Sequence, residues 1–485
     1  MKKQTISLFL ALLSLSLACA SCGETSQTPA SDTEALKTGE TVAVTEEEKQ
    51  PSFYDLLETR DFGGKTYTEL DANSHPDFHV NIPGDELTGE LVNDALFNRD
   101  TAVEDRFNLK LDYVQETNCD KMKKAVLAGE HVYDLAISTM GELANLASAG
   151  ILCNLCDLPE ISLKENWWSP LMADALKLND AMYFTAGDIA PAVYQAPCCM
   201  FLNLKLYQDY DIDTDIYQLV LDGKWTLEAL ESLTKDMDVD VNGDSKWDTD
   251  NDIYGIGMQP TSETTGAFLS GAGISLCSFN ADGTNLVFDA LDNPRTEEAC
   301  ARITKIARDI PYSDINDVIN KTFKENRALF LQHKLESAAV HLRDMEADYL
   351  ILPDPKYDEA QETYISFVSI YVVGFTGIPM TADMELAGFV TEALARYSHE
   401  YLRPIAYDLV YKQKDTRDPR SADVLDLLFD NLYIDFTSVY NFGSVNDALT
   451  TVIFKDKPYA STLEKKRSSV DKAIVKLVDN WNTEG

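Results

Sequence analysis

The sequence predicts an α/β protein built from two domains, and three observations support this prediction. About 430 of the 485 residues follow residue 52, which is more chain than one hydrophobic core usually organises. A strand, a helix and a second strand are predicted in succession between residues 108 and 138. Helical patterns recur in the second half of the chain. Because a strand–helix–strand unit of about thirty residues joins parallel strands, we expect a parallel sheet.

Four consecutive segments predict the first domain. Residues 108–114, NLKLDYV, alternate apolar and polar side chains as a half-buried strand does. The following DKMKKAVLAGEH, residues 120–131, has helical spacing, and YDLAIS at 133–138 is a short apolar strand. Residues 89–107 precede these segments and are expected to form a helix. Their apolar side chains lie at helical spacing: Leu91, Ala95, Val103 and Phe107.

The second half contains similar elements. Residues 226–237 are expected to form a helix that begins with a threonine, a candidate N-cap. Residues 384–404 place apolar side chains at i, i+3, i+4 and i+7. Asp418 and Pro419 are expected to start another helix, with the proline at its first position. The apolar stretch at 364–380 is interrupted by Ser, Gly and Thr, so it predicts buried strands and not a membrane span.

Residues 1–22 have the features of a secretory lipoprotein signal. Two lysines precede the apolar stretch at 6–17, which is too short to span a membrane, and small residues follow. The tetrapeptide ASCG resembles the bacterial lipobox, so Cys22 is expected to carry diacylglycerol; Cys19 is a weaker candidate, and a plain secreted protein is the alternative. Residues 23–52 contain almost no large apolar residue and predict a disordered tether. We therefore expect a folded part that is lipid-anchored at the extracellular face of the cytoplasmic membrane.

Composition and motifs exclude several classes of function. The formal net charge of −40 is too acidic for a protein that seeks nucleic acid or an anionic lipid surface. Cys153 and Cys156 have redox or metal spacing, but no second CxxC and no nearby His accompany them. The chain shows no GxSxG, HExxH or P-loop motif. The sequence therefore offers no candidate catalytic residue.

The stretch DVDVNGDSKWDTDNDIYG, residues 238–255, predicts a calcium loop. Carboxylates at alternate positions of a tight loop can all point inward, as oxygen ligands of Ca²⁺ do. A register that starts at Asp238 places Gly243 at the sixth position but lacks ligands at the ninth and twelfth. A register that starts at Asp240 supplies more ligands, at the cost of Ser245 at the turn, and is preferred. Its ligands would be Asp240, Asn242, Asp244, the Lys246 carbonyl, Asp248 and Asn251, with Asp252 beside them.

No glutamate closes this loop as in a regulatory calcium site, so weak affinity and a structural role are expected. A solvated acidic loop without metal is the alternative.

Several aromatic residues favour a ligand cleft. They stand beside turn signals or polar residues and not within apolar stripes. A sugar ring has an apolar face and a hydroxylated rim, which suits aromatic faces next to polar groups. For any one of them, core packing is the alternative interpretation. The set is Trp167, Trp168, Tyr183, Tyr194, Trp225, Tyr433, Phe436 and Tyr440.

Eight segments, in order along nearly the whole mature chain, resemble extracellular solute-binding proteins of family 1, the maltose-binding-like subunits of ABC importers. More narrowly, they resemble the lipoprotein branch of Gram-positive anaerobes. The segments are GELVNDALFNRDTAVEDRFNLKL, EHVYDLAISTMGELANLASAGILCNLCDLPEI, ENWWSPLMADALKLNDAMYFTAGDIA, MFLNLKLYQDYDID, DGKWTLEAL, the Asp/Asn loop with IYGIG, LPDPKYDEAQETYIS and KDTRDPRSADVLDLLFDNLYIDF.

The resemblance implies a two-lobed, periplasmic-binding-protein-like α/β fold, with hinge-linked lobes and an interlobe ligand cleft. Hinge crossings are expected near Asp188–Tyr194, Asn320 and Pro353. Lobe one would then comprise residues 53–188 plus 321–353. Lobe two would comprise residues 189–320 plus 354–485.

The resemblance also implies a solute receptor and not an enzyme. It would deliver a small solute, expected to be a sugar or oligosaccharide, to ABC permease subunits by hinge closure, and it would act as a monomer. A surface glycan-degrading enzyme and an adhesin lipoprotein are the alternatives. Side chains beyond strand ends are the expected ligand contacts. They are Thr139, Met140, Trp168, Asp188, Tyr194, Gln195, Gln259, Glu263, Thr264, His333, Glu336, Tyr433 and Tyr440.

Overall fold

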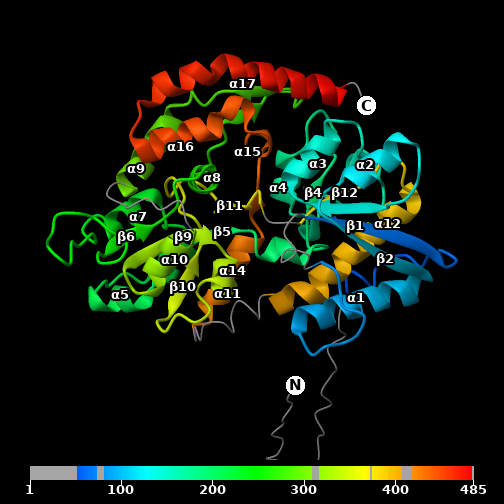
Figure 1. Cartoon of the computed structure of the whole chain (residues 1–485), viewed down its shortest axis with the longest axis horizontal. Helices are drawn as coiled ribbons and strands as arrows, with labels where there is room; N and C mark the ends of the chain where they lie inside the picture. The colour runs from blue at the N-terminus through cyan, green and yellow to red at the C-terminus, as the bar shows by residue number, and fades with distance from the viewer. Residues whose placement is uncertain (1–51, 74–80, 308–315, 372–373, 407–417, 483–485) are drawn as a thin grey trace, which may run out of the picture. The chain divides into compact units, whose positions relative to one another are not determined.

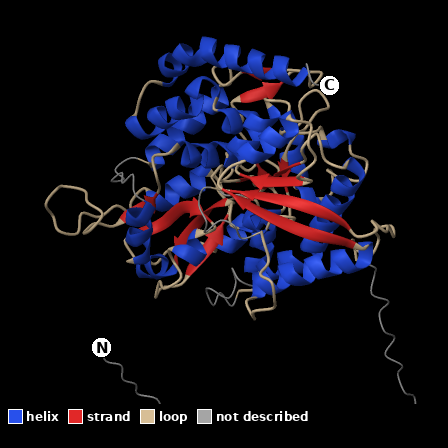
Figure 2. Ribbon diagram, turned by 45° about the vertical axis from the view of Figure 1, so that its right-hand side comes forward, coloured by secondary structure: helices blue, strands red, loops and turns tan. Residues whose placement is uncertain are grey.

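The computed structural model describes residues 52–73, 81–307, 316–371, 374–406 and 418–482. The predicted signal segment, Cys22 and the tether up to residue 51 lie outside these residues. The described chain contains two larger sheets, each covered by helices (Figures 1 and 2). We call the elements around the five-stranded sheet the first lobe and those around the four-stranded sheet the second lobe. Within the described residues, no helix is long and apolar enough to cross a membrane.

The first sheet has the strand order β2-β1-β3-β12-β4. Strand β1 pairs in parallel with both β2 and β3, and β12 is antiparallel to both β3 and β4. Helix α2 connects β2 to β3, which confirms the predicted strand–helix–strand unit. The strands are β1 Lys65–Ala72, β2 Leu109–Glu116, β3 Leu135–Ser138, β4 Thr185–Ala186 and β12 Phe375–Gly377.

Helices cover both faces of this sheet because side chains alternate along its strands. Leu135 and Ile137 of β3 pack in one cluster with Phe107 of α1 and Phe389 of α12, whereas Ala136 packs on the opposite face. The opposite face is covered by α2 and α3, whose buried side chains include Met122 and Leu143. The helices are α1 Leu91–Phe107, α2 Asp120–Leu127, α3 Met140–Ala147 and α12 Met384–Tyr397.

The second sheet has the order β10-β5-β9-β6. Strand β5 is antiparallel to β9 and β10, and β6 is parallel to β9. The strands are β5 Cys198–Asn203, β6 Tyr254–Gly257, β9 Ala328–Lys334 and β10 Tyr349–Leu352. The helices that follow or cover them are α5 Leu204–Asp209, α6 Ile216–Leu221, α7 Leu227–Thr234, α8 Ser262–Gly271, α9 Pro294–Ile306, α10 Asn316–Lys324, α11 Ser337–Val340 and α14 Arg420–Phe429.

Further helices and two strand pairs lie outside the two larger sheets. They are α4 Pro170–Ala175, α15 Phe436–Tyr440, α16 Val445–Lys455, α17 Tyr459–Asn482, and the strand pairs β7 Cys277–Phe279 with β8 Leu286–Phe288 and β11 Ser366–Phe367 with β13 Leu432–Tyr433. Helix α17 runs over the second lobe towards α3 (Figure 1). The apolar stretch at 364–380 forms buried strands β11 and β12, as predicted.

Local capping follows the sequence. The Thr226 side chain accepts a hydrogen bond from the backbone of Ala229 at the start of α7, which confirms it as an N-cap. The helix predicted to begin with Pro419 at its first position starts one residue later, at Arg420, and Pro419 is its N-cap.

The predicted lobe boundaries require correction. Residues 321–353, predicted in lobe one, contain β9 and β10, which pair with β5 in the second sheet. Residues 354–485, predicted in lobe two, include β12 and α12, which belong to the first lobe. Asn320 is therefore not a hinge crossing. The pairing partner of a buried strand depends on distant segments, so the apolar pattern of β9 did not identify it.

Along the described residues, the chain passes between the lobes three times. It leaves the first sheet after Ala186 and enters the second at Cys198, which agrees with the predicted crossing near Asp188–Tyr194. It returns between Leu352 and Phe375, so the crossing expected near Pro353 lies at the beginning of this segment. It passes back between α12 and α14, partly through residues outside the described ones.

Candidate functional site

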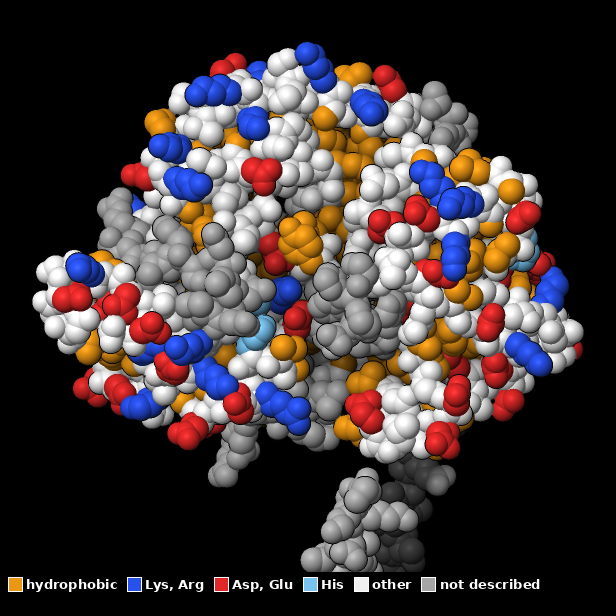
Figure 3. Space-filling model, viewed as in Figure 1, with side chains coloured by type: hydrophobic (Ala, Val, Ile, Leu, Met, Phe, Trp, Pro, Cys, Tyr) orange, Lys and Arg blue, Asp and Glu red, His pale blue; other side chains and the backbone are white. Residues whose placement is uncertain are grey.

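A cavity of about 650 Å³ lies between the lobes. Its lining comes from both lobes and from two of the connections between them. Acidic, basic, histidine and hydrophobic side chains gather in the central hollow of the face shown in Figure 3. The lining residues are Ile82, Glu90, Val92, Asn93, Leu96, Pro191, Tyr194, Gln195, Leu335, Glu336, Ala338, Ala339, Arg343, Leu402 and Ala406.

The first-lobe wall is the beginning of α1, and polar contacts fix it. The Glu90 side chain caps the helix by accepting a 2.8 Å hydrogen bond from the backbone of Asn93. The Asn93 side chain accepts a 2.6 Å bond from the Gly84 backbone and donates a 3.2 Å bond to the Glu86 carbonyl. These contacts hold the incoming turn against the helix, so Val92 and Leu96 line the cavity from a rigid element.

The second-lobe wall is attached to the connection that crosses between the lobes. The backbone of Leu335 donates to the Pro197 carbonyl at 2.8 Å, and the backbone of Glu336 donates to the Gln195 carbonyl at 3.1 Å. The returning connection joins the same group, because the backbone of Ser369 donates to the Ala196 carbonyl at 2.9 Å. Two crossings are thus hydrogen-bonded to each other where the cavity begins.

The charged groups of this wall are close together. The Lys334 ammonium lies 3.5 Å from the Glu336 carboxylate, and both side chains are largely buried. Burial raises the pKa of Glu263 above its usual value, although the charge of Lys334 and a hydrogen bond from Ser369 lower it. The Ser369 hydroxyl contacts the Glu263 carboxylate directly.

Three residues predicted to bind ligand lie on the cavity lining: Tyr194, Gln195 and Glu336. Glu263 lies near them: its carboxylate contacts the Ser369 hydroxyl, and the charge of Lys334 lowers its pKa. Their contact with a ligand stays a prediction.

The prediction that Trp168 stacks on a ligand is wrong. Its side chain is 1% exposed, and its indole N–H donates a 2.7 Å hydrogen bond to the Glu392 carboxylate. Trp167 donates to the other oxygen of the same carboxylate at 3.0 Å. A stacking ring needs an accessible face, so this tryptophan pair is part of the core of the first lobe.

The other predicted residues do not line the cavity. Thr139 caps α3 and accepts a hydrogen bond from the backbone of Glu142, and Met140 is buried beside it. Thr264 is buried at the start of α8, where it contacts Thr261. Gln259 lies in the turn between β6 and α8, and its carbonyl accepts a hydrogen bond from the Thr261 backbone.

His333 is buried in β9, and its Nδ1 contacts the Ser337 hydroxyl at 2.5 Å. Burial lowers the pKa of His333 to about 3, so its ring is neutral at physiological pH. Tyr433 belongs to β13 and pairs with Phe367 of β11. Tyr440 is stacked between Phe436 and Phe442 and points its hydroxyl at the Ala144 carbonyl of α3, 3.5 Å away.

Asp188 has a structural role in the first crossing. Its carboxylate lies 2.5 Å from Nδ1 of His399 and 3.9 Å from the Arg403 guanidinium. The neighbouring Ile189 carbonyl accepts a 2.9 Å hydrogen bond from the buried Arg99. These contacts attach the crossing to the first lobe, away from the cavity lining.

Sequence reasoning missed the aliphatic part of the lining. Val92, Leu96, Leu335 and Leu402 have the spacing of core residues, so nothing in their pattern distinguishes a cavity wall from a buried face. Lys334 and Arg343 were also missed, since a single cation in a chain this acidic gives no motif.

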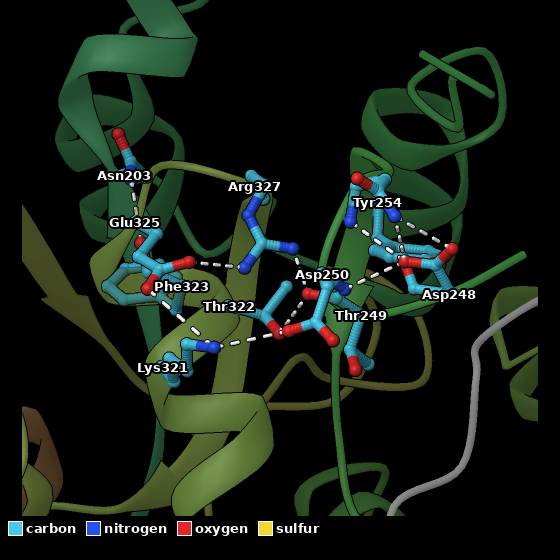
Figure 4. A network of polar contacts seen from close by, with 11 residues as sticks. Asn203, Asp248, Thr249, Asp250, Tyr254, Lys321, Thr322, Phe323, Glu325 and Arg327 are labelled. Carbon is cyan, nitrogen blue, oxygen red and sulfur yellow. Dashed lines mark hydrogen bonds and ion pairs between the residues drawn. The ribbon is translucent and has the colours of Figure 1, made fainter. Parts of the chain in front are cut away.

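The acidic loop connects α7 to β6 in the second lobe and projects beside β6 (Figures 1 and 2). Its base is fixed by polar contacts drawn in Figure 4. Lys321 pairs with Asp250 at 3.1 Å, Arg327 donates to the Thr249 carbonyl, and the Tyr254 hydroxyl donates to the Asp248 carbonyl at 2.8 Å.

Backbone N–H groups of the loop bind its carboxylates. Asp240 accepts from Gly243 at 2.7 Å and from Ser245 at 2.8 Å, and Asp248 accepts from Asn251 at 2.8 Å. Ser245 has a φ of 63°, which is the strained turn that the preferred register expects. Among the described residues, no three or more His, Cys, Asp or Glu side chains are placed to hold a metal ion. Calcium binding stays a prediction.

No protein-family model matches the sequence, and no curated protein matches it. Solved structures do match. An ABC substrate-binding protein from Listeria monocytogenes in complex with cycloalternan is 12% identical, with a TM-score of 0.53, over 85% of this chain and 99% of that one. A cyclo/maltodextrin-binding protein complexed with maltotetraose is 13% identical, with a TM-score of 0.54, over 87% and 98%.

The maltose-binding periplasmic protein of Listeria monocytogenes, in complex with maltose, is 16% identical, with a TM-score of 0.50, over 87% of this chain and 99% of that one. At sequence identities this low, the structural similarity establishes a shared fold. The predicted two-lobed α/β fold is confirmed, and these binding proteins share it.

Proposed function

We propose that the protein is the solute receptor of an ABC importer and that its solute is a sugar or an oligosaccharide. The observation that carries this proposal is the cavity of about 650 Å³ that both lobes and their connections line. Its volume falls in the range of sites for small molecules. The three similar structures, which share this fold, are complexes with cycloalternan, maltotetraose and maltose.

The mechanism follows from the position of the cavity. Val92 and Leu96 form one wall on α1, and Leu335 and Ala338 form part of the other wall in the second lobe. Rotation of the lobes about the three crossings would bring these walls together on the solute and remove water from both. A closed, solute-loaded form differs in shape from the open form, and a permease can select it.

The proposal also includes the location of the protein and a bound calcium ion. A lipid on Cys22 and a tether over residues 23–52 would hold the receptor, as a monomer, at the extracellular face of the cytoplasmic membrane. Calcium in the loop from Asp240 to Asp252 would stabilise the connection between α7 and β6 and would take no part in solute binding. The anchor rests on the sequence pattern of residues 1–52, and the calcium proposal on the ligand pattern of the loop.

A thermal-shift screen of the folded chain against mono- and oligosaccharides tests the function. Occupancy at a hundred times Kd stabilises a protein by about 2.7 kcal/mol, which such a screen detects readily. We expect at least one sugar to raise the melting temperature, with calorimetry confirming one site per chain. Stabilisation by no sugar, together with release of reducing ends from a glycan, would show instead that the protein is a glycan-degrading enzyme.

A further inference from the structure

Glu336 brings a poorly compensated carboxylate to the cavity. It follows β9 directly, and its backbone is fixed by the hydrogen bond to the Gln195 carbonyl. Its Oε2 is buried, and no donor among the residues that the structure describes hydrogen-bonds to it. The cation beside it, Lys334, lies at 3.5 Å without hydrogen-bond geometry. The side chain does not cap α11 either. A buried carboxylate in this situation lacks the donors that water would supply.

A second carboxylate competes for the same lysine. Glu263 is buried against Ser369, and its pKa is raised first by burial and further by the negative charge of Glu336. The charge of Lys334 acts in the opposite direction on Glu263. One ammonium thus stands near two carboxyl groups, and burial favours the neutral form of one of them, Glu263.

The other described residues of the lining add no buried cation beside Glu336. Glu90 on the opposite wall adds a carboxylate, of which one oxygen caps α1. Gln195 is neutral, and Arg343, the one guanidinium among the described lining residues, is an exposed side chain. The remaining lining residues are mainly aliphatic. A ligand anion placed next to Glu336 would be repelled by its carboxylate, whereas a neutral ligand would leave Lys334 as the only described cation beside it.

We propose that the solute carries an ammonium group that binds Glu336, so that the sugar taken up is an amino sugar. A charge-assisted hydrogen bond from the ammonium to the cavity-lining Glu336 carboxylate would give that carboxylate a donor. The aliphatic residues on both walls would contact the C–H faces of the ring. This inference rests on the proposed function, because it assigns the chemical class of the solute to the same cavity.

Matched sugars that differ in one substituent test the proposal. Glucosamine, N-acetylglucosamine and glucose, and their β-1,4-linked disaccharides, carry an ammonium, an acetamide or a hydroxyl group on the same carbon. Calorimetry in mildly acidic buffer, where the amine is protonated, would measure their affinities for the full chain. We expect the amine to bind at least about tenfold more tightly than either counterpart.

The Glu336→Gln variant identifies the group responsible. It keeps the shape of the side chain and removes its charge, so we expect the preference for the amine to fall to about twofold or less. Glu346→Gln is the matched control, because Glu346 is exposed and lies outside the lining. It should keep the full preference. Circular dichroism would confirm that both variants are folded.

The outcomes separate this inference from the proposed function. Equal or tighter binding of the hydroxyl or acetamide form overturns the amino-sugar assignment and leaves the receptor standing. An unchanged preference in Glu336→Gln also overturns it, since a group other than Glu336 would then recognise the ammonium. Binding of other sugars, with none of the amino sugars bound, would likewise overturn the amino-sugar assignment and leave the receptor function standing. Failure of every sugar to bind contradicts the proposed function itself.

Discussion

Trp481, on the last turn of α17, packs edge-on against Tyr183, with ring centroids 4.8 Å apart. Trp481 belongs to the C-terminal helix, which covers the second lobe, whereas Tyr183 directly precedes β4 of the first sheet. The Trp481 ring also meets Phe436 of α15 at 5.1 Å. The C-terminal helix therefore contacts both lobes.

Replacement of Trp481 tests how much this contact contributes to stability. The side chain is 3% exposed, and truncation of a buried tryptophan costs about 3 kcal/mol or more. We expect Trp481→Ala to lower the free energy of urea unfolding by that amount. Val475→Ala in the same helix is the control, because Val475 is 55% exposed and should change stability by less than about 0.5 kcal/mol. Equal effects of the two variants would show that the contact between Trp481 and Tyr183 carries no stability.

Trp168 provides a test of the site assignment. Trp168→Phe removes the donor of a 2.7 Å hydrogen bond to the buried Glu392 carboxylate. Because bonds to charged groups contribute about 1.5–3 kcal/mol, we expect stability to fall by about 2 kcal/mol and sugar affinity to change less than twofold. Trp247→Phe, at a 40% exposed ring on the acidic loop, should alter neither quantity. A large loss of affinity with unchanged stability would return Trp168 to the ligand site.

The sequence predicted individual helices and strands better than it predicted which segments they pack against. The unit at 108–138, the cap at Thr226 and the buried strands in 364–380 depend on local spacing, and all three were found. The position of β9 depends on its pairing with β5 and β6, which lie far away in the sequence. The same limit applies to the site. Trp168 has the composition of a ligand platform, but its burial is decided by Glu392, which is more than 200 residues away.

A buried carboxyl group should make stability depend on pH. Burial raises the pKa of Asp354 from its usual 3.8 to about 7, so the folded state binds a proton that the unfolded state has released between these values. Its contribution is fully present below pH 3.8 and is lost as the pH rises through about 7. We therefore expect the free energy of unfolding of the wild type to fall, relative to that of Asp354→Asn, as the pH rises from 3.8 to 7.

This comparison isolates Asp354 because other shifted groups are present in both proteins. Glu69 shifts in the same direction, to about 8, whereas His333, lowered to about 3, acts in the opposite direction below its usual 6.5. Parallel curves for the two proteins would mean that Asp354 is ionised in the folded state throughout this range.

Calcium removal tests the loop. We expect added calcium to raise the melting temperature of chelator-treated protein and to leave the ranking of sugar affinities unchanged, because the loop lies outside the cavity lining. In Asp240→Asn the shift should be smaller, since the first ligand of the preferred register is weakened. An identical melting temperature with calcium and with chelator would mean that the backbone N–H groups and Lys321 and Arg327 stabilise the loop without metal.

The central claim is that two hinged lobes close on a solute held in the cavity between them. Small-angle scattering of the chain, with and without a sugar that the thermal-shift screen identifies, measures this closure directly. We predict that a saturating amount of the sugar lowers the radius of gyration, whereas a sugar that gives no thermal shift leaves it unchanged. A sugar that calorimetry shows to be bound, with no change in the scattering curve, would contradict the claim.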